Sequence, residues 1–192
     1  MPIQINGNGT ITGINVGGLP NGIVDTDMLA ANAVSAAKLA SGAGGKVLQV
    51  VSSSTTSQHT NETGTFEDTN LSGSITPSST SSKILVTVSQ AYEFQRANTE
   101  AGCSIRLLRD STVIDSAVSS DGGKYKLYSY TNAASNYSMY NCYSVTVLDS
   151  PNTTSAITYK TQSAVYIANS SGRVKSQSGS IPSYITMMEI AA

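Results

Sequence analysis

The chain of 192 residues is 39% apolar, contains only 12% charged residues and has a formal net charge of −1. Soluble globular domains carry about twice that share of charged residues. Here hydroxyl side chains replace the missing charge, because 31 Ser and 21 Thr make up 52 of the 192 residues. A nearly neutral chain has no long-range attraction to nucleic acid or to an anionic membrane, so we expect neither as a partner.

The sequence carries no targeting or membrane-spanning pattern. No window approaches 18 continuous apolar residues, and residues 1–10 lack the basic start and apolar stretch of a signal peptide. We therefore expect a soluble protein made in a cytosol, with Cys103 and Cys142 as reduced thiols on core strands. Neither cysteine has a partner at metal-ligand spacing, so we expect no metal and no other cofactor.

A glycine-rich run at residues 42–45 separates an aromatic-free stretch from the region that holds every Tyr and Phe. We place the domain boundary there. Residues 1–22 are predicted to form an arm that is rich in Gly and Asn, with short extended pieces but no core of its own. The spaced aliphatic side chains of this arm are the candidates for docking on a larger particle: Ile3, Ile5, Ile11, Ile14 and Val16.

Residues 23–45 contain a short internal repeat followed by the glycine-rich linker. Residues 23–32 align with residues 33–42, so that Val24 matches Val34 and Leu29 matches Leu39. The segment could be extended or helical, and a stripe this narrow cannot bury itself. Three copies around an axis could bury it, which predicts a trimeric neck lined by these four residues. The alternative is a solvated, loosely ordered arm.

From residue 46 onward the pattern is that of β-strands. Residues 83–89 place Ile84, Val86 and Val88 on one face and Thr87 and Ser89 on the other, the period of two of a half-buried antiparallel strand. Residues 104–107 and 112–114 flank the turn residues Asp110 and Ser111 and predict a hairpin. Further strands are predicted at residues 47–51, weakly near 66, and at 126–130, 143–147, 157–160 leading on to 165–167, and 184–190. Eight or nine strands over residues 46–192 predict an all-β fold, a two-sheet antiparallel jelly-roll-like sandwich.

The residue types that enzymes use are thinly spread. His59 is the single histidine and lies among turn formers, so we expect it in a solvated loop with no strand to orient it. Asp68, Glu93 and Glu100 lie in or beside predicted loops and Glu189 lies on the last strand, yet glycosidase chemistry needs two carboxyl groups about 5 to 9 Å apart. No spacing ties any two of these acids together. The sequence therefore predicts no catalytic residue and no enzyme.

Tyrosine is the one side chain in excess. Six of the ten tyrosines lie between residues 124 and 143: Tyr125, Tyr128, Tyr130, Tyr137, Tyr140 and Tyr143. A tyrosine ring stacks on sugars and packs in protein interfaces equally well. Tyr137 and Tyr140 are the candidates for contact with a host surface or glycan. The alternative is that the alternate tyrosines, Tyr128 and Tyr130, pack the sandwich or a trimer seam.

Two groups of short motifs resemble known proteins. The first group resembles the anchor and neck of virion surface proteins of tailed bacteriophages. It consists of Gly-Gly-Leu-Pro at residues 17–20, the repeat at 24–39 with its Ala-Val-Ser-Ala-Ala-Lys-Leu-Ala copy, and Lys-Val-Leu-Gln-Val-Val at 46–51. The second group resembles the jelly-roll knobs of phage fibres and head-decoration proteins. It consists of Lys-Ile-Leu-Val at 83–86, Leu-Leu-Arg-Asp-Ser-Thr at 107–112 and Ile-Thr-Met-Met-Glu-Ile at 185–190.

This resemblance implies a homotrimer on the virion surface, made in the host bacterial cytoplasm. Its N-terminal part would dock on the major capsid protein or another virion protein, and residues 46–192 would point outward. We expect a capsid decoration, cement or short head-fibre protein. The alternative is a short tail fibre that recognises a host surface glycan or protein. The repeat of 20 residues spans at most about 66 Å extended and about 30 Å as a helix, a short reach for a host-searching fibre.

Overall fold

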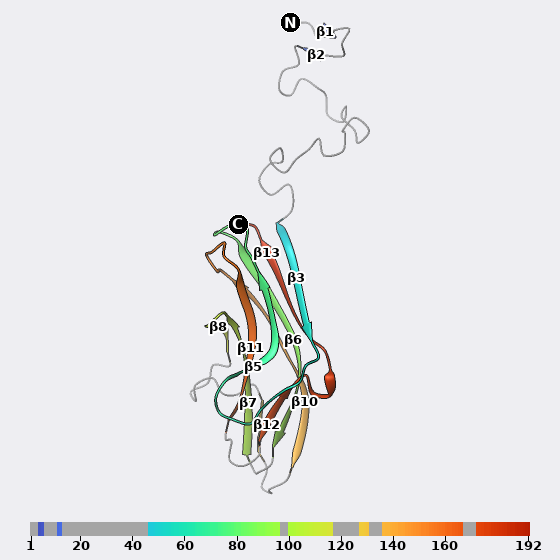
Figure 1. The fold of residues 1–192 in the computed structure, drawn as a ribbon, viewed down its shortest axis with the longest axis vertical. Coiled ribbons are helices and arrows are strands. Elements are labelled where there is room, and N and C mark those ends of the chain that lie inside the picture. Colours follow the sequence, from blue (N-terminus) through green and yellow to red (C-terminus); the bar gives the residue numbers. More distant parts are fainter. Residues whose placement is uncertain are drawn as a thin grey trace. The chain divides into compact units, whose positions relative to one another are not determined.

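The computed structural model describes residues 4–5, 11–12, 46–96, 100–116, 127–130, 136–166 and 172–192. The chain divides into two units, residues 1–45 and 46–192, and each is described by itself. In the first unit, β1 (Gln4–Ile5) pairs antiparallel with β2 (Ile11–Thr12), so that the backbone of Ile5 lies opposite Ile11. The second unit is all-β and is built from two antiparallel sheets (Figure 1).

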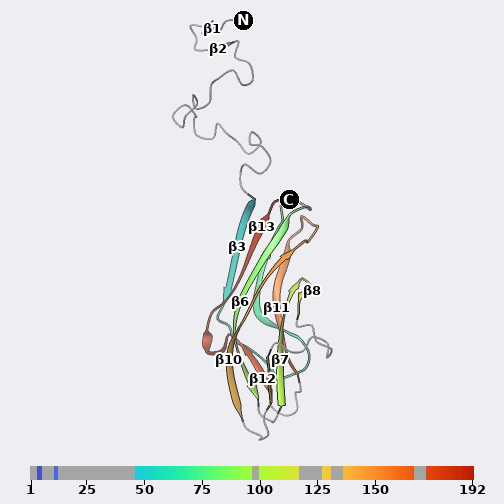
Figure 2. The ribbon, with the colours of Figure 1, turned by 180° about the vertical axis from the view of Figure 1, so that it is seen from behind.

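The first sheet is organised around one long strand, β6 (Lys83–Arg96). One edge of β6 pairs along nearly its whole length with β10 (Tyr137–Asp149), which Figure 2 shows from behind. The other edge pairs with two strands in succession, β13 (Ser183–Ile190) and β12 (Arg173–Ser176). A short 3-10 helix, η3 (Ser178–Ser180), separates these two strands. Beyond them, β3 (Val47–Thr55) pairs with β13 and β4 (His59–Asn61) pairs with β12.

The second sheet has the order β5-β11-β7-β8, and β9 also pairs with β7. Its strands are β5 (Glu67–Ile75), β7 (Glu100–Arg109), β8 (Thr112–Asp115), β9 (Leu127–Tyr130) and β11 (Ile157–Tyr166). The predicted hairpin is confirmed, because β7 turns into β8 through Asp110 and Ser111, and Asp110 adopts a φ of 51°. The Asp110 carboxylate also accepts a hydrogen bond from the Thr158 N–H at 3.0 Å, which ties this turn to β11.

The core lies between the two sheets and is built from the alternating residues of each strand. Ile84, Val86 and Val88 on β6 are fully buried, as their spacing predicts. They pack with Leu71, Phe94, Ile105, Leu107, Tyr159, Ile185 and Met187 among others. Gly73 on β5 leaves room for the partner sheet, because a Cβ at this position would lie 2.6 Å from Met187 Cε.

Three sequence predictions about this unit are wrong in part. The unit has eleven strands in its described residues, because β4 and β12 form in segments with almost no apolar signal. Glu93 lies within β6, where it faces Lys175 of β12 in the register, rather than in or beside a loop, and it is buried. Cys103 is a core residue as expected, but Cys142 is exposed, because alternation along β10 turns Tyr143 inward and its neighbour outward.

Candidate functional site

A polar groove of about 570 Å³ opens on the second sheet, where β5 and β11 run beside the segment that links β3 to β4. Hydroxyl and amide side chains dominate its lining, together with one acid and one lysine: Thr55, Ser57, Asp68, Asn70, Leu71, Ser72, Thr158 and Lys160. Ser72 lies opposite Lys160 in the β5–β11 register, and Ser74 lies opposite Thr158. The groove therefore follows the polar, outward positions of two neighbouring strands.

An ion pair at one end fixes the charge of the groove. Lys160 Nζ lies 2.8 Å from Asp68 Oδ2, and Gln162 Nε2 donates to Asp68 Oδ1 at 2.8 Å. Partial burial raises the pKa of Asp68, but the hydrogen bonds from Lys160 and Gln162 outweigh that effect and hold the pKa below its usual value. Asp68 is thus an ionised hydrogen-bond acceptor with its charge compensated, which suits recognition of hydroxyl groups better than proton transfer.

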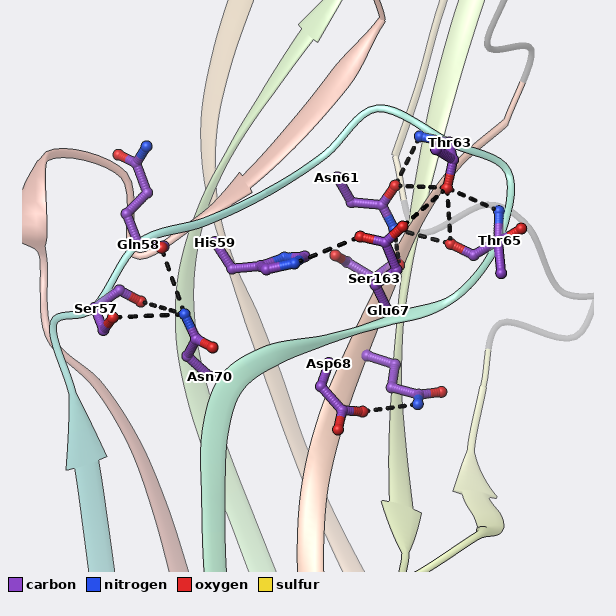
Figure 3. Close-up of polar contacts among 11 residues, drawn as sticks. Ser57, Gln58, His59, Asn61, Thr63, Thr65, Glu67, Asp68, Asn70 and Ser163 are labelled. Carbon is purple, nitrogen blue, oxygen red and sulfur yellow. Dashed lines mark hydrogen bonds and ion pairs between the residues drawn. The ribbon is translucent and has the colours of Figure 1, made fainter.

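The loop above the groove is held by Asn61, the last residue of β4. The Asn61 amide donates to the backbone oxygens of Thr65 and Ser163 at 2.8 and 2.7 Å, and its oxygen accepts from the Thr63 N–H at 2.7 Å (Figure 3). Asn61 is buried, so these bonds lock the turn that leads from β4 into β5. The groove is consequently built on a fixed frame.

His59 lies on a strand, so the prediction of an unoriented loop histidine is wrong. It belongs to β4, and its Nε2 lies 3.5 Å from Glu67 Oε2 (Figure 3). Three residues further along β5, Asn70 adopts a φ of 66° and donates through its amide to the backbone oxygens of Ser57 and Gln58, both at 3.4 Å. These contacts fasten the β3–β4 link to the rim of the groove.

The acids considered as catalytic pairs serve separate structural roles. Glu93 accepts hydrogen bonds from Ser178 Oγ at 2.7 Å and from Lys175 Nζ at 3.2 Å. Glu189 is fully buried and accepts from Ser78 and from Gln49 Nε2. Asp68 is engaged at the groove, and Glu100 begins β7. Among the residues whose side chains are described, no group of three or more His, Cys, Asp and Glu could hold a metal ion.

The predicted binding tyrosines lie on β10. Tyr137 and Tyr140 have exposed fractions of 53% and 69%. The guanidinium of Arg96 lies 5.9 Å from the centre of the Tyr137 ring. Tyr143 on the same strand is buried in the core, and its hydroxyl donates to Asp115 Oδ2 at 2.5 Å. The side chains of Tyr128 and Tyr130 lie outside the described part of the structure.

The predicted docking and neck residues all belong to the first unit, residues 1–45. The four neck residues, together with Ile3, Ile14 and Val16, lie outside the described residues, and only the backbone pairing of Ile5 with Ile11 is described.

The polar groove was not predicted from the sequence. Its available signal was the alternation of Asp68, Asn70, Ser72 and Ser74 with buried residues along β5.

The sequence matches no protein-family profile and no curated protein at a significant level. The described residues also contain no helix with the length and apolar character needed to cross a membrane.

Proposed function

We propose that this chain is a structural protein of a tailed-bacteriophage virion, a homotrimeric capsid decoration, cement or short head-fibre protein. Residues 1–22 dock on the major capsid protein or another virion protein, and the sandwich of residues 46–192 is displayed outward on the virion surface. The protein is made in the host bacterial cytoplasm. It acts through binding and display, with no enzymatic step and no nucleic-acid or membrane partner.

The order of the strands is the observation that carries this proposal. β12 and β13 both pair with the same edge of β6, and β4 and β3 pair in turn with these two strands. β8 and β9 both pair with β7. Each of these three pairs of short strands occupies one position in its sheet, so the eleven strands fill eight positions. Counted along the chain, one sheet then has the order 1-8-3-6 and the other 2-7-4-5. This order supports a jelly roll, an architecture frequent among viral capsid proteins.

The chemistry of the groove supports a non-enzymatic role. Asp68 is the one acid among the residues described as lining it, and Lys160 and Gln162 occupy its carboxylate oxygens. Hydrolysis of a glycosidic bond needs a second carboxyl group across the cleft. The groove instead offers hydroxyls and amides, which form hydrogen bonds without reacting.

Attachment to the particle is tested by adding purified protein to virions that lack it and sedimenting the particles. The full chain is expected to co-sediment. Removal of residues 1–22, or replacement of Ile3, Ile5, Ile11, Ile14 and Val16 by Ser, is expected to abolish co-sedimentation while circular dichroism of the β-sandwich stays unchanged. Undiminished binding by both variants would move the attachment surface into the sandwich and contradict the proposed docking arm.

The trimeric neck is tested by native mass spectrometry of the full chain. Three copies of a 19.9 kDa chain give a species of about 60 kDa. Replacement of Val24, Leu29, Val34 and Leu39 by Ser is expected to shift the protein toward smaller species. A folded monomer at micromolar concentration would contradict assembly, and a stable dimer would contradict the threefold arrangement.

A second function, that of a short tail fibre, is favoured by one observation. Tyr137 and Tyr140 leave more than half of their surface exposed near one end of β10. Exposed, closely spaced tyrosines are typical of surfaces that bind sugars or proteins. Adsorption to the host that depends on these two rings would favour a tail-fibre role over decoration alone.

A further inference from the structure

The outward face of the first sheet carries an apolar row across four strands. Val50 on β3 lies opposite Met188 on β13, Met188 lies opposite Leu85 on β6, and Leu85 lies opposite Leu148 on β10. Val50 and Leu148, at the two ends of the row, are 56% and 59% exposed. Apolar side chains that line up in this way on an exposed face mark an interaction surface.

The next two rows on this face contain hydroxyl side chains and no charge. Directly adjacent to the apolar row lie Ser52, Thr186, Thr87 and Thr146, followed by Ser54, Tyr184, Ser89 and Ser144. We call these twelve residues of the three rows the neutral face. Charged side chains keep exposed surfaces from associating, and these twelve residues carry none. Lys83, which lies opposite Ile190 in the row on the other side of the apolar row, is the charge that borders the neutral face on β6.

Several hydroxyls of the neutral face already satisfy one another. Ser52 Oγ lies 3.1 Å from Thr186 Oγ1, and Thr87 Oγ1 lies 3.3 Å from Thr146 Oγ1, each pair bridging two neighbouring strands. Polar groups that are paired within one molecule lose little when water is removed from above them. The neutral face could therefore be covered by a second protein surface at low desolvation cost.

The apolar row lies at the end of the sandwich where the chain enters from the N-terminal unit. β3 begins at Val47, and the Ala191 N–H donates to the Lys46 oxygen at 2.7 Å, so the start of β3 is fixed to the end of β13. Val47 and Leu48, which are 52% and 50% exposed, extend the apolar surface beside this point. In the sequence only six residues separate Lys46 from Leu39, the last residue of the proposed neck. Copies joined through that neck would therefore keep the starts of their β3 strands within about 25 Å of it.

We propose that the neutral face is the surface through which the sandwiches of neighbouring copies of this chain pack against one another. Around a threefold axis, one side of this face can pack against the other side of the same face on the next copy, and no charge on the twelve residues opposes that contact. A charged partner would find no counter-charge on these residues. The choice of a second copy rests on the proposed function, because the trimeric neck supplies the reason why copies meet at this end.

The size of the face indicates that it acts together with the neck. Four strands about 4.8 Å apart and three rows about 6.8 Å apart cover roughly 400 Å² in projection. A stable interface buries about 800 Å² on each partner. The neutral face is smaller than this, so a stable assembly needs both the neck and the face. Loss of the neutral face is expected to weaken the assembly strongly even though the N-terminal unit remains.

The test uses the full chain and places charges on the two most exposed apolar positions, in the double variant Val50→Glu, Leu148→Glu. The matched control is Val113→Glu, since Val113 is 41% exposed on β8 of the other sheet. Sedimentation velocity over a concentration series is expected to show at least tenfold weaker association for the double variant and unchanged association for the control. Equal association of wild type and double variant would overturn the proposed interface.

Oxidation of methionine by hydrogen peroxide gives a second readout in the same samples. Met188 lies on the neutral face, whereas its neighbour Met187 is fully buried in the core and reports on unfolding. Met188 is expected to oxidise more slowly in the wild-type assembly than in the double variant, with Met187 protected in both. Equal Met188 rates would overturn the proposal. If Met187 becomes reactive because the double variant unfolds, Leu148→Ser is measured in the same two assays, with the same outcomes decisive.

The same variants separate this inference from the proposed function. If the double variant dissociates but the chain is missing from purified virions, the result supports the interface and contradicts the virion role. If the chain is present in virions but its assembly is unchanged by these substitutions, the result supports the virion role and contradicts the interface. A double variant that assembles normally but no longer binds particles would assign the face to the capsid and overturn packing between copies.

Discussion

The carboxylate of Glu189 on β13 accepts hydrogen bonds from both the backbone N–H and the hydroxyl of Ser78, at 2.7 and 2.6 Å. The two residues are 111 positions apart, and the bonds join the last strand to the loop between β5 and β6. Gln49 Nε2 donates to the other carboxylate oxygen at 2.6 Å. A fully buried carboxylate is thus held by neutral donors from two separate segments.

Glu189 is expected to make stability depend on acid. Burial raises its pKa, but the hydrogen bonds from Ser78 and Gln49 outweigh that effect and lower the pKa to about 2. Because the pKa is lower in the folded state than the ordinary value of about 4.3, its stabilisation is complete above about pH 4.3 and is lost as the pH falls toward 2. Urea unfolding between pH 7 and pH 2 measures this loss.

Glu189→Gln is expected to lower the free energy of unfolding at pH 7 by about 1–3 kcal/mol. The reason is that the new side-chain NH2 group would face the donor groups of Ser78 and Gln49 and would have no acceptor there. The variant should also show a shallower decline of stability in acid. Glu62→Gln is the control, since the Glu62 side chain is 61% exposed and lies 3.7 Å from Arg173. Equal stability of the two variants at pH 7 would contradict the role assigned to Glu189.

A second prediction concerns Asp149, which joins the two sheets. Asp149 accepts from Arg109 Nη1 and, at 2.7 Å, from the hydroxyl of the fully buried Tyr159. Burial, followed by this bond to a carboxylate, raises the pKa of Tyr159. Tyr159→Phe is expected to cost about 1–3 kcal/mol in chemical denaturation. Tyr184→Phe, on an exposed side chain, should cost close to nothing; a similar loss in both would show that the Asp149 bond is not the cause.

The two free thiols are expected to react differently. Cys103 is buried, and burial raises the pKa of its thiol to about 12, whereas Cys142 is exposed on β10. In the native protein a maleimide should label Cys142 and leave Cys103 unmodified, and both should react after unfolding without reductant. Mass spectrometry reads the labels. Failure of both to react after unfolding would show that the cysteines are paired.

The exposed tyrosines give a prediction that distinguishes decoration from host recognition. If the sandwich binds a host surface, the double variant Tyr137→Ser, Tyr140→Ser should weaken adsorption, by about 1–3 kcal/mol for each lost aromatic contact. The melting temperature should stay unchanged because both rings are exposed. Unchanged adsorption would favour decoration alone, and a large fall in melting temperature would place these rings in a subunit interface.

Strands with regular alternation could be predicted from the sequence, and strands defined by distant partners could not. Ile84, Val86 and Val88 share one buried face of β6, a pattern visible in the sequence. By contrast, His59 forms a strand only because β12, more than a hundred residues later, supplies the pairing backbone. The exposure of Cys142 was readable from the alternation of Val145 and Val147, had it been extended back along β10.

The groove shows the same division. The polar outward positions of β5 were visible in the sequence, but the pairing of Asp68 with Lys160 joins residues 92 positions apart and follows from the β5–β11 register. The neutral face likewise depends on the registers of four strands from distant parts of the chain. Sequence patterns give the face of one strand, whereas a site needs the order of several.

The proposed place of this chain on a tailed-phage virion is tested most directly by cryo-electron microscopy of purified particles, combined with quantitative mass spectrometry of the same particles. We predict threefold density for the sandwich on the outside of the head, with a copy number that is a multiple of three. Threefold density at the tail tip would instead favour the receptor-binding alternative. The lack of this chain from purified virions, or its presence there as isolated monomers, would contradict the account.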